Sequence, residues 1–173
     1  MSTAGFQKII AASVADRADL FLTTANRLGA PLINIEKDFW ACWTLNALYH
    51  RLPAGGPRLL FKGGTSLSKA YGLIDRFSED IDVTVFRDDL GHGATPEALA
   101  TLSGKKRKAA IEAIQNDCQA YITGPLLTQV AQLIGEDTGG EGRIEIDPDD
   151  STEQTLLVWY PRVDGSPSCD PFH

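Results

Sequence analysis

The sequence has few cysteines, no long hydrophobic run and fewer basic than acidic residues. Its three cysteines, Cys42, Cys118 and Cys169, are scattered without metal-ligand spacing, which is typical of reduced thiols and argues against a disulfide framework. No segment approaches the roughly 20 apolar residues of a membrane-spanning helix, and no basic segment leads into an apolar run near the N-terminus. We therefore expect a cytoplasmic protein with no signal peptide and no membrane partner.

The negative charge of the chain is unevenly distributed. Sixteen basic residues against 23 acidic ones give a net charge of -7, which alone argues against a nucleic-acid partner. Ten of the acidic residues, however, lie within residues 136–173, whereas residues 51–76 hold five basic residues and one acidic residue. The segment 51–76 is thus locally basic and suited to attract a polyanion.

Helical periodicity dominates the first 52 residues. Apolar residues recur at helical spacing from Phe6 to Leu28, and Gly29 with Pro31 ends this first amphipathic helix. A second helix is expected with Asn34 as its N-cap. Its apolar stripe comprises Ile35, Phe39, Trp40, Trp43, Ala47, Leu48 and Tyr49. We interpret the aromatic stripe as core and not as a base-stacking platform, because helical periodicity explains it without a ligand.

Strands and helices are mixed in the rest of the chain, which predicts an α/β (α+β) fold. The expected strands are residues 58–62, 80–86, 143–147 and 154–160, and the expected helices are residues 66–71 and 104–134. The long helix should kink at Gly124-Pro125, and residues 87–103 are typical of a mobile excursion. The inward side chains of the helix expected at 104–134 should be Ile111, Ile114, Cys118, Tyr121, Ile122, Leu126, Val130 and Leu133.

A two-glycine turn precedes the short helix. Gly63 and Gly64 remove the side chains that would keep a phosphate away from backbone N–H groups, and the helix presents its positive end. Ser66 adds a hydroxyl, and Lys69 lies on the same helical face. The alternative is an ordinary tight turn with a serine cap, since this motif is weak and differs from the longer Gly-Lys-Ser/Thr phosphate loop.

Two carboxylates follow on one strand face. Asp80 and Asp82 alternate with Ile81, so they lie a few ångströms apart and repel each other unless a cation is shared. Mg²⁺ is the cation that suits them, because it uses one or two carboxylates together with substrate phosphates. A solvated edge-strand face is the alternative, and the basic turn that precedes the pair argues against it.

The segment Asp80-Ile-Asp-Val-Thr84 also fits the Asp-x-Asp-x-Thr pattern of haloacid-dehalogenase-like phosphatases. In that superfamily the hydrophobic strand precedes the aspartates. Here Arg76-Phe-Ser-Glu79 precedes them and the hydrophobic alternation follows. The acids open the strand, which argues against a phosphatase.

Four segments carry a more specific pattern: Glu36–Trp40, Phe61–Tyr71, Arg76–Asp82 and Lys105–Lys108. Together they resemble the AbiEii/AbiGii toxin family of nucleotidyltransferases, within the DNA polymerase β-like superfamily. The resemblance covers about Ile35 to Val163 and implies a small mixed sheet flanked by helices, with an N-terminal helical pair and a long central helix. The expected organisation is one domain at 1–163, with N-terminal helices at 4–52, a core at 58–163 and an irregular tail at 164–173.

The resemblance also implies the roles of the site residues. The nucleotide-binding residues would be Lys62, Gly63, Gly64, Thr65, Ser66 and Lys69, and Asp80 and Asp82 would be catalytic and hold Mg²⁺. The implied activity is transfer of a nucleotidyl group from an NTP to RNA, with tRNA as the acceptor, by a toxin that has a cognate antitoxin. The alternative is a truncated, inactive member that only binds a nucleotide or a protein.

Two features remain open at the level of sequence. The family resemblance implies a third carboxylate on a strand after Tyr160-Pro161, where this chain has no such strand; Glu145 or Asp147 is a weak substitute, because an acid on an alternating strand is usually solvated. Four successive cations, Lys105, Lys106, Arg107 and Lys108, are either a solvated face or a grip for RNA phosphates.

Overall fold

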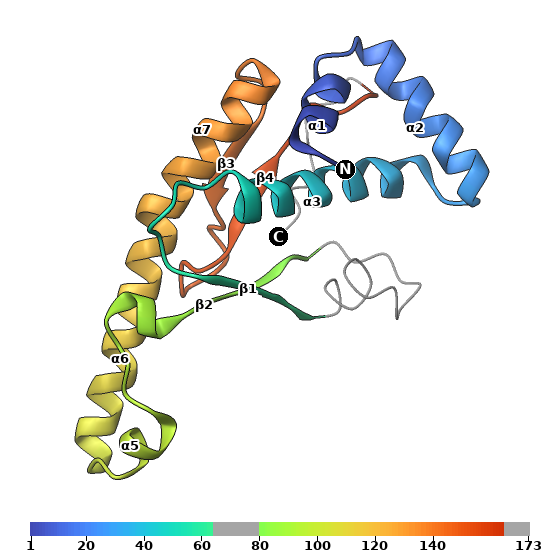
Figure 1. Cartoon of the computed structure of the whole chain (residues 1–173). Helices are drawn as coiled ribbons and strands as arrows, with labels where there is room; N and C mark the ends of the chain where they lie inside the picture. Colours follow the sequence, from blue (N-terminus) through green and yellow to red (C-terminus); the bar gives the residue numbers. More distant parts are fainter. Residues whose placement is uncertain (64–79, 165–173) are drawn as a thin grey trace.

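The computed structural model describes residues 1–63 and 80–164 (Figure 1). The N-terminal helices are α1 (Thr3–Ile10), α2 (Val14–Leu28) and α3 (Leu32–His50). The single helix expected up to Leu28 is therefore two helices, because Ser13 caps a new one by accepting a hydrogen bond from the Asp16 N–H at 3.1 Å. The expected start of α3 is also wrong: Pro31, in extended conformation, is its N-cap in place of Asn34.

The aromatic stripe of α3 forms the centre of the core, as the periodicity predicts. Trp43 is fully buried, and Trp40 is 1% exposed and stacks on Tyr160 with ring centroids 5.2 Å apart. Phe39 packs against Phe6 of α1 and Phe21 of α2. The prediction for Tyr49 is wrong, since this residue in the last turn of α3 is 38% exposed.

The strands form two antiparallel hairpin-like pairs. β1 (Leu59–Lys62) pairs with β2 (Asp82–Val85), and β3 (Arg143–Ile146) pairs with β4 (Leu156–Trp159). This confirms the α/β class. Among the described residues, however, the strands make two separate antiparallel sheets in place of one mixed sheet, because each strand pairs with its sequence neighbour and a cavity separates the pairs.

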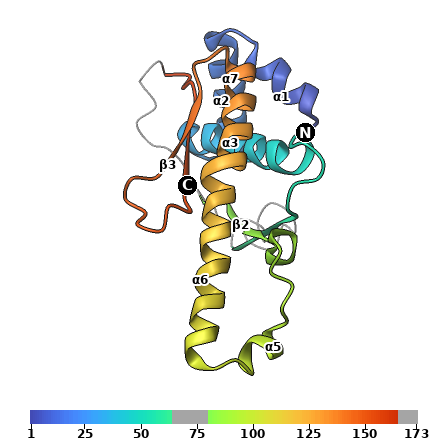
Figure 2. The ribbon, with the colours of Figure 1, turned by 90° about the vertical axis from the view of Figure 1, so that its left-hand side faces the viewer.

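A helical rod runs alongside both strand pairs. It consists of α6 (Gly104–Tyr121), η2 (Ile122–Leu126) and α7 (Leu127–Thr138). A π-helical segment at η2 accommodates Pro125, so the rod continues through the position where we expected a kink (Figures 1 and 2). Segment 87–103, predicted as an excursion, contains the short helices η1 (Arg87–Leu90) and α5 (Pro96–Ala100).

The buried face of the rod is confined to its C-terminal half. Ile122, Leu126 and Val130 are buried as predicted, whereas Ile111 is 44% exposed and its inward assignment is wrong. The reason is that the N-terminal half of α6 projects beyond the core (Figures 1 and 2). Within the described ranges no helix is long and apolar enough to cross a membrane.

One buried carboxylate ties the end of the described chain to α3. Glu36 is 2% exposed, and its Oε1 accepts a hydrogen bond from the Val163 N–H at 2.8 Å. Burial raises the pKa of Glu36, although the Val163 hydrogen bond and the neighbouring Arg162 partly oppose this.

We expect Glu36→Gln to reduce the pH dependence of unfolding. The folded state holds the Glu36 proton more tightly than the unfolded chain, so this group's contribution to the free energy of unfolding is lost as pH rises from about 4.3 through the raised pKa. Glutamine is neutral and still accepts the Val163 hydrogen bond. Urea unfolding of both proteins between about pH 4 and pH 8 measures the effect, and equal pH slopes would contradict the assignment.

Candidate functional site

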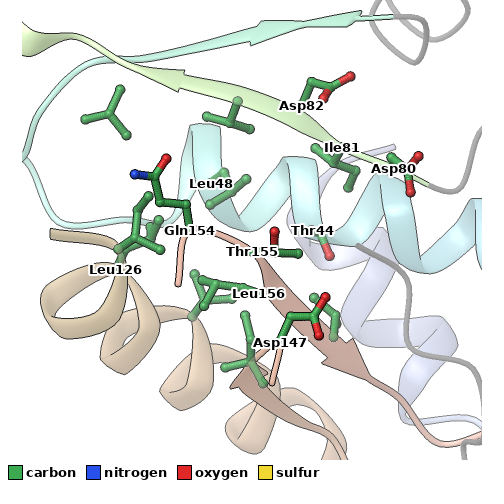
Figure 3. Close-up of a pocket in the computed structure, with 16 residues that line it drawn as sticks. Thr44, Leu48, Asp80, Ile81, Asp82, Leu126, Asp147, Gln154, Thr155 and Leu156 are labelled. Atoms are coloured by element: carbon green, nitrogen blue, oxygen red, sulfur yellow. The ribbon is translucent and has the colours of Figure 1, made fainter. Parts of the chain in front are cut away.

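A cavity of about 510 Å³ lies between the β1–β2 pair, β4, α3 and the rod (Figure 3). This volume is within the range of small-molecule sites. Its walls are mostly apolar and include Leu48, Ile81, Val83, Ile122, Leu126, Ile144 and Leu156. Its polar lining residues are Thr44, Asp80, Asp82, Asp147, Gln154 and Thr155. The cavity thus combines an apolar body with a few polar groups.

The two predicted carboxylates border this cavity. Asp80 and Asp82 are exposed while Ile81 between them is half-buried, in agreement with the alternation in the sequence. β2 itself begins at Asp82 and not at Asp80 as expected. Figure 3 shows Asp82 at the start of β2 and Asp80 on the chain just before it. Two carboxylate side chains on one segment are the donor set that Mg²⁺ uses together with phosphates.

Gly63 lies directly against the second carboxylate. The β1–β2 register places Lys62 opposite Asp82, so the next residue, Gly63, passes beside the Asp82 side chain. Gly63 has a φ of 76°, and a Cβ added there would collide with Asp82 Oδ2 and lie 2.8 Å from its Cγ. Only glycine satisfies both the positive φ and this close approach. The fold therefore places Gly63, the first glycine of the predicted turn, beside Asp82 of the predicted acid pair.

The rest of the predicted nucleotide-binding segment lies outside the described residues. This applies to Gly64, Thr65, Ser66 and Lys69, and to the helix expected at 66–71. Lys62 is exposed at the end of β1, opposite Asp82. The phosphate-binding roles of these residues stay predictions.

Thr44 is a cavity residue that sequence reasoning missed. It is 6% exposed, and its hydroxyl has no hydrogen-bond partner in the described structure. It lines the cavity from α3 (Figure 3). An unpaired buried hydroxyl costs about 1–3 kcal/mol, which a polar group of a bound ligand would offset. A threonine within an apolar helical stripe carries no signal in the sequence.

The loop between β3 and β4 is fixed by Asp150. Its carboxylate accepts hydrogen bonds from the Thr152 N–H at 2.8 Å and from the Thr155 hydroxyl at 2.8 Å. The hydrogen bonds from Thr152, Thr155 and Gln154 hold the pKa of Asp150 well below its usual range. This loop presents Asp147 to the cavity.

Of the two acids considered as substitutes for a third carboxylate, only Asp147 lines the cavity. Glu145 forms an ion pair with Arg143 at 3.6 Å on the exposed side of β3. In the described parts of the chain, no three His, Cys, Asp or Glu side chains are close enough to hold a metal ion together. Asp147 thus shares the cavity with Asp80 and Asp82 without forming a three-acid cluster with them.

The basic run does not lie beside the cavity. Lys105 to Lys108 are exposed in the first turns of α6. At 1.5 Å per residue, Lys105 is about 25 Å along the rod from Ile122 in the cavity wall. A grip on RNA by these residues would act at a distance from the acid pair.

The contact of Gly63 with Asp82, at a cavity between strands and helices, fits the site that the motif resemblance to a nucleotidyltransferase implies. The family model described as "Nucleotidyl transferase AbiEii toxin, Type IV TA system" matches residues 46–169. The chain belongs to this family. No curated protein and no solved structure shows significant similarity to the chain. The match confirms the resemblance inferred from the motifs and begins within α3, leaving α1 and α2 outside it.

Proposed function

We propose that this nucleotidyltransferase transfers a nucleotidyl group from an NTP to RNA in a Mg²⁺-dependent reaction, with tRNA as the acceptor. The observation that carries the proposal is the contact of Gly63 with Asp82, which supports a phosphate-binding role for the glycine turn beside a metal-binding role for the carboxylates. Its setting would be a cytoplasmic toxin-antitoxin system with a cognate antitoxin, as the type IV toxin family suggests.

Each group of residues at the cavity has its own role in this proposal. The turn at Gly63 offers backbone N–H groups to the triphosphate, and Asp80 and Asp82 offer carboxylate oxygens to Mg²⁺. When bound, Mg²⁺ neutralises charge on the phosphates. The apolar walls and the Thr44 hydroxyl fit the remainder of the nucleotide.

The proposed reaction is an in-line displacement. The acceptor hydroxyl oxygen forms a bond to the α-phosphorus of the NTP, and the bond from that phosphorus to the β-phosphate oxygen breaks. Pyrophosphate leaves with the electron pair of the broken bond, and the hydroxyl proton passes to solvent. Because phosphoryl-type transfer depends mainly on positioning and charge stabilisation, the placement of Asp80 and Asp82 is decisive.

A second candidate is a family member that binds the nucleotide without transferring it. The observation in its favour is that Asp80 and Asp82 gather no third acid around a common metal position within the described ranges. Loss of one ligand weakens the activation of an attacking hydroxyl.

A transfer assay distinguishes the two candidates. The chain is incubated with total tRNA and each of the four α-labelled NTPs, with Mg²⁺ or with EDTA. We expect Mg²⁺-dependent label at the RNA 3′ end from at least one NTP. Mg²⁺-dependent NTP binding in equilibrium dialysis without any transfer would favour the second candidate, and the absence of both would overturn the nucleotide site.

A further inference from the structure

The N-terminal half of α6 forms an exposed arm. No residue of α6, Gly104–Tyr121, is buried. With α5 it projects away from the rest of the molecule (Figures 1 and 2). A helix of this length gains most of its stability in a protein from packing one face, and this one leaves most of its surface open to a partner.

A groove of about 410 Å³ lies between α5 and α6 on this arm. Its floor is apolar, formed by Pro96, Leu99, Ala100, Ile111 and Ile114. Two arginines, Arg87 and Arg107, are among its lining residues. Arg87 donates a hydrogen bond to the Ala94 carbonyl at 2.7 Å, which fixes its guanidinium group near the groove.

The charge at this end of the arm is strongly positive. Four cations occupy the first turns of α6: Lys105, Lys106, Arg107 and Lys108. The first turn of this helix holds no acidic residue. Each cation at a helix N-terminus destabilises the helix by about 0.3–1 kcal/mol, because it opposes the helix dipole. Within residues 1–63 and 80–164, only Lys108 of these four has an ion pair, with Glu112 at 3.7 Å. Of these four cations only Arg107 lines the groove, together with Arg87, and the other three lie next to Arg107 in the first turns of α6. This end of the arm is therefore complementary to a polyanion, even though the whole chain carries a charge of -7.

Two elements set the distance between the groove and the cavity. Arg107 precedes Ile122 by fifteen helical residues, which is about 22 Å at 1.5 Å per residue. Arg87 follows Asp82 by five residues, which is at most about 17 Å of extended chain. For a stacked strand, with about the 3.4 Å rise per nucleotide of one strand of duplex DNA, these distances correspond to roughly five to seven nucleotides.

We propose that the α5–α6 groove binds the phosphodiester backbone of the acceptor RNA about five to seven nucleotides before its reacting 3′ end. The inference rests on the proposed function and deepens it, because it defines the acceptor by length. An RNA shorter than this spacing occupies only one of the two places at a time, whereas a longer RNA engages both. The apolar floor accommodates sugar and base surface while the cations contact phosphates.

The test compares a groove variant with a charge-matched control. The groove variant is Lys106→Ala with Arg107→Ala, which removes one groove-lining cation and its neighbour in α6. The control is Lys8→Ala with Arg27→Ala, two exposed cations on α1 and α2. Alanine preserves helix propensity, and circular dichroism verifies the fold of each. Binding of labelled oligoribonucleotides of about 4 and about 12 nucleotides is measured by fluorescence anisotropy without NTP over a range of salt concentrations.

We expect the groove variant to lose about tenfold in affinity for the longer RNA and to lower its salt slope by about 1.4, from two lost single-strand phosphate contacts. The control variant should show little change, and the wild-type chain should bind the shorter RNA more weakly than the longer one. Equal losses in both variants, or wild-type affinity that does not depend on RNA length, would overturn the proposal and leave the groove to a protein partner. Since binding is measured without NTP, loss of transfer with length-dependent binding intact would contradict the proposed reaction and not the groove.

Discussion

Asp82→Asn should lower the rate of label transfer from NTP to tRNA by about a thousandfold or more. Asparagine keeps the shape of the side chain beside Gly63 and removes the negative charge that a hard cation requires. Mg²⁺-dependent NTP binding should weaken in parallel. Single-turnover transfer with the labelled NTP, and dialysis of the same NTP with and without Mg²⁺, measure the two effects.

Asp147→Asn is the matched control for this variant. It removes one carboxylate charge from the same cavity, but from the end of β3 and outside any three-acid cluster of the described residues. We expect its transfer rate to stay within about tenfold of wild type. Unchanged transfer in Asp82→Asn would sink the metal assignment, and an equal loss in Asp147→Asn would make Asp147 a third member of the centre.

The second large effect is expected from Gly63→Ala. Alanine at a φ of 76° costs about 1–2 kcal/mol of backbone strain, and its Cβ collides with the Asp82 carboxylate. Because displacement of a catalytic group by about 1 Å lowers rates by about a hundredfold, we expect a loss of transfer of at least this size. Transfer rate and urea unfolding of the variant provide the two measurements.

Gly29→Ala separates the strain from the collision. Gly29 ends α2 with a φ of 64°, and an added Cβ there has no heavy atom within 4 Å. This variant should lose a similar amount of stability, about 1–2 kcal/mol, and keep its transfer activity. If Gly63→Ala lost only stability, in the same measure as Gly29→Ala, the contact with Asp82 would have no part in the reaction.

The local parts of the site could be predicted from the sequence because short-range spacing determines them. A positive-φ glycine after one strand and an Asp-x-Asp at the start of the next describe adjacent places in a hairpin-like pair. The presence of four strands and the class of the fold follow from periodicities of two and 3.6 residues for the same reason. The family motifs added roles that spacing alone does not assign.

The long-range parts could not be predicted in this way. Thr44 carries no signal in the sequence. It lines the cavity because β2 and β4 lie opposite α3 across it. The division into two strand pairs depends on which strands hydrogen-bond to each other, and local sequence patterns do not specify this pairing. The remote position of Lys105 follows from the continuity of the rod through Pro125, where the proline predicted a kink in the helix.

The π-helical segment η2 joins the exposed arm of the rod to its buried part. Its residues Ile122 and Leu126 are buried in the cavity wall, while the arm beyond them extends about 25 Å to Lys105. A tilt of about 5° with η2 as the fulcrum would move the tip of the arm by about 2 Å. Because α6, η2 and α7 are continuous, such a tilt would also move the two side chains that shape the cavity wall.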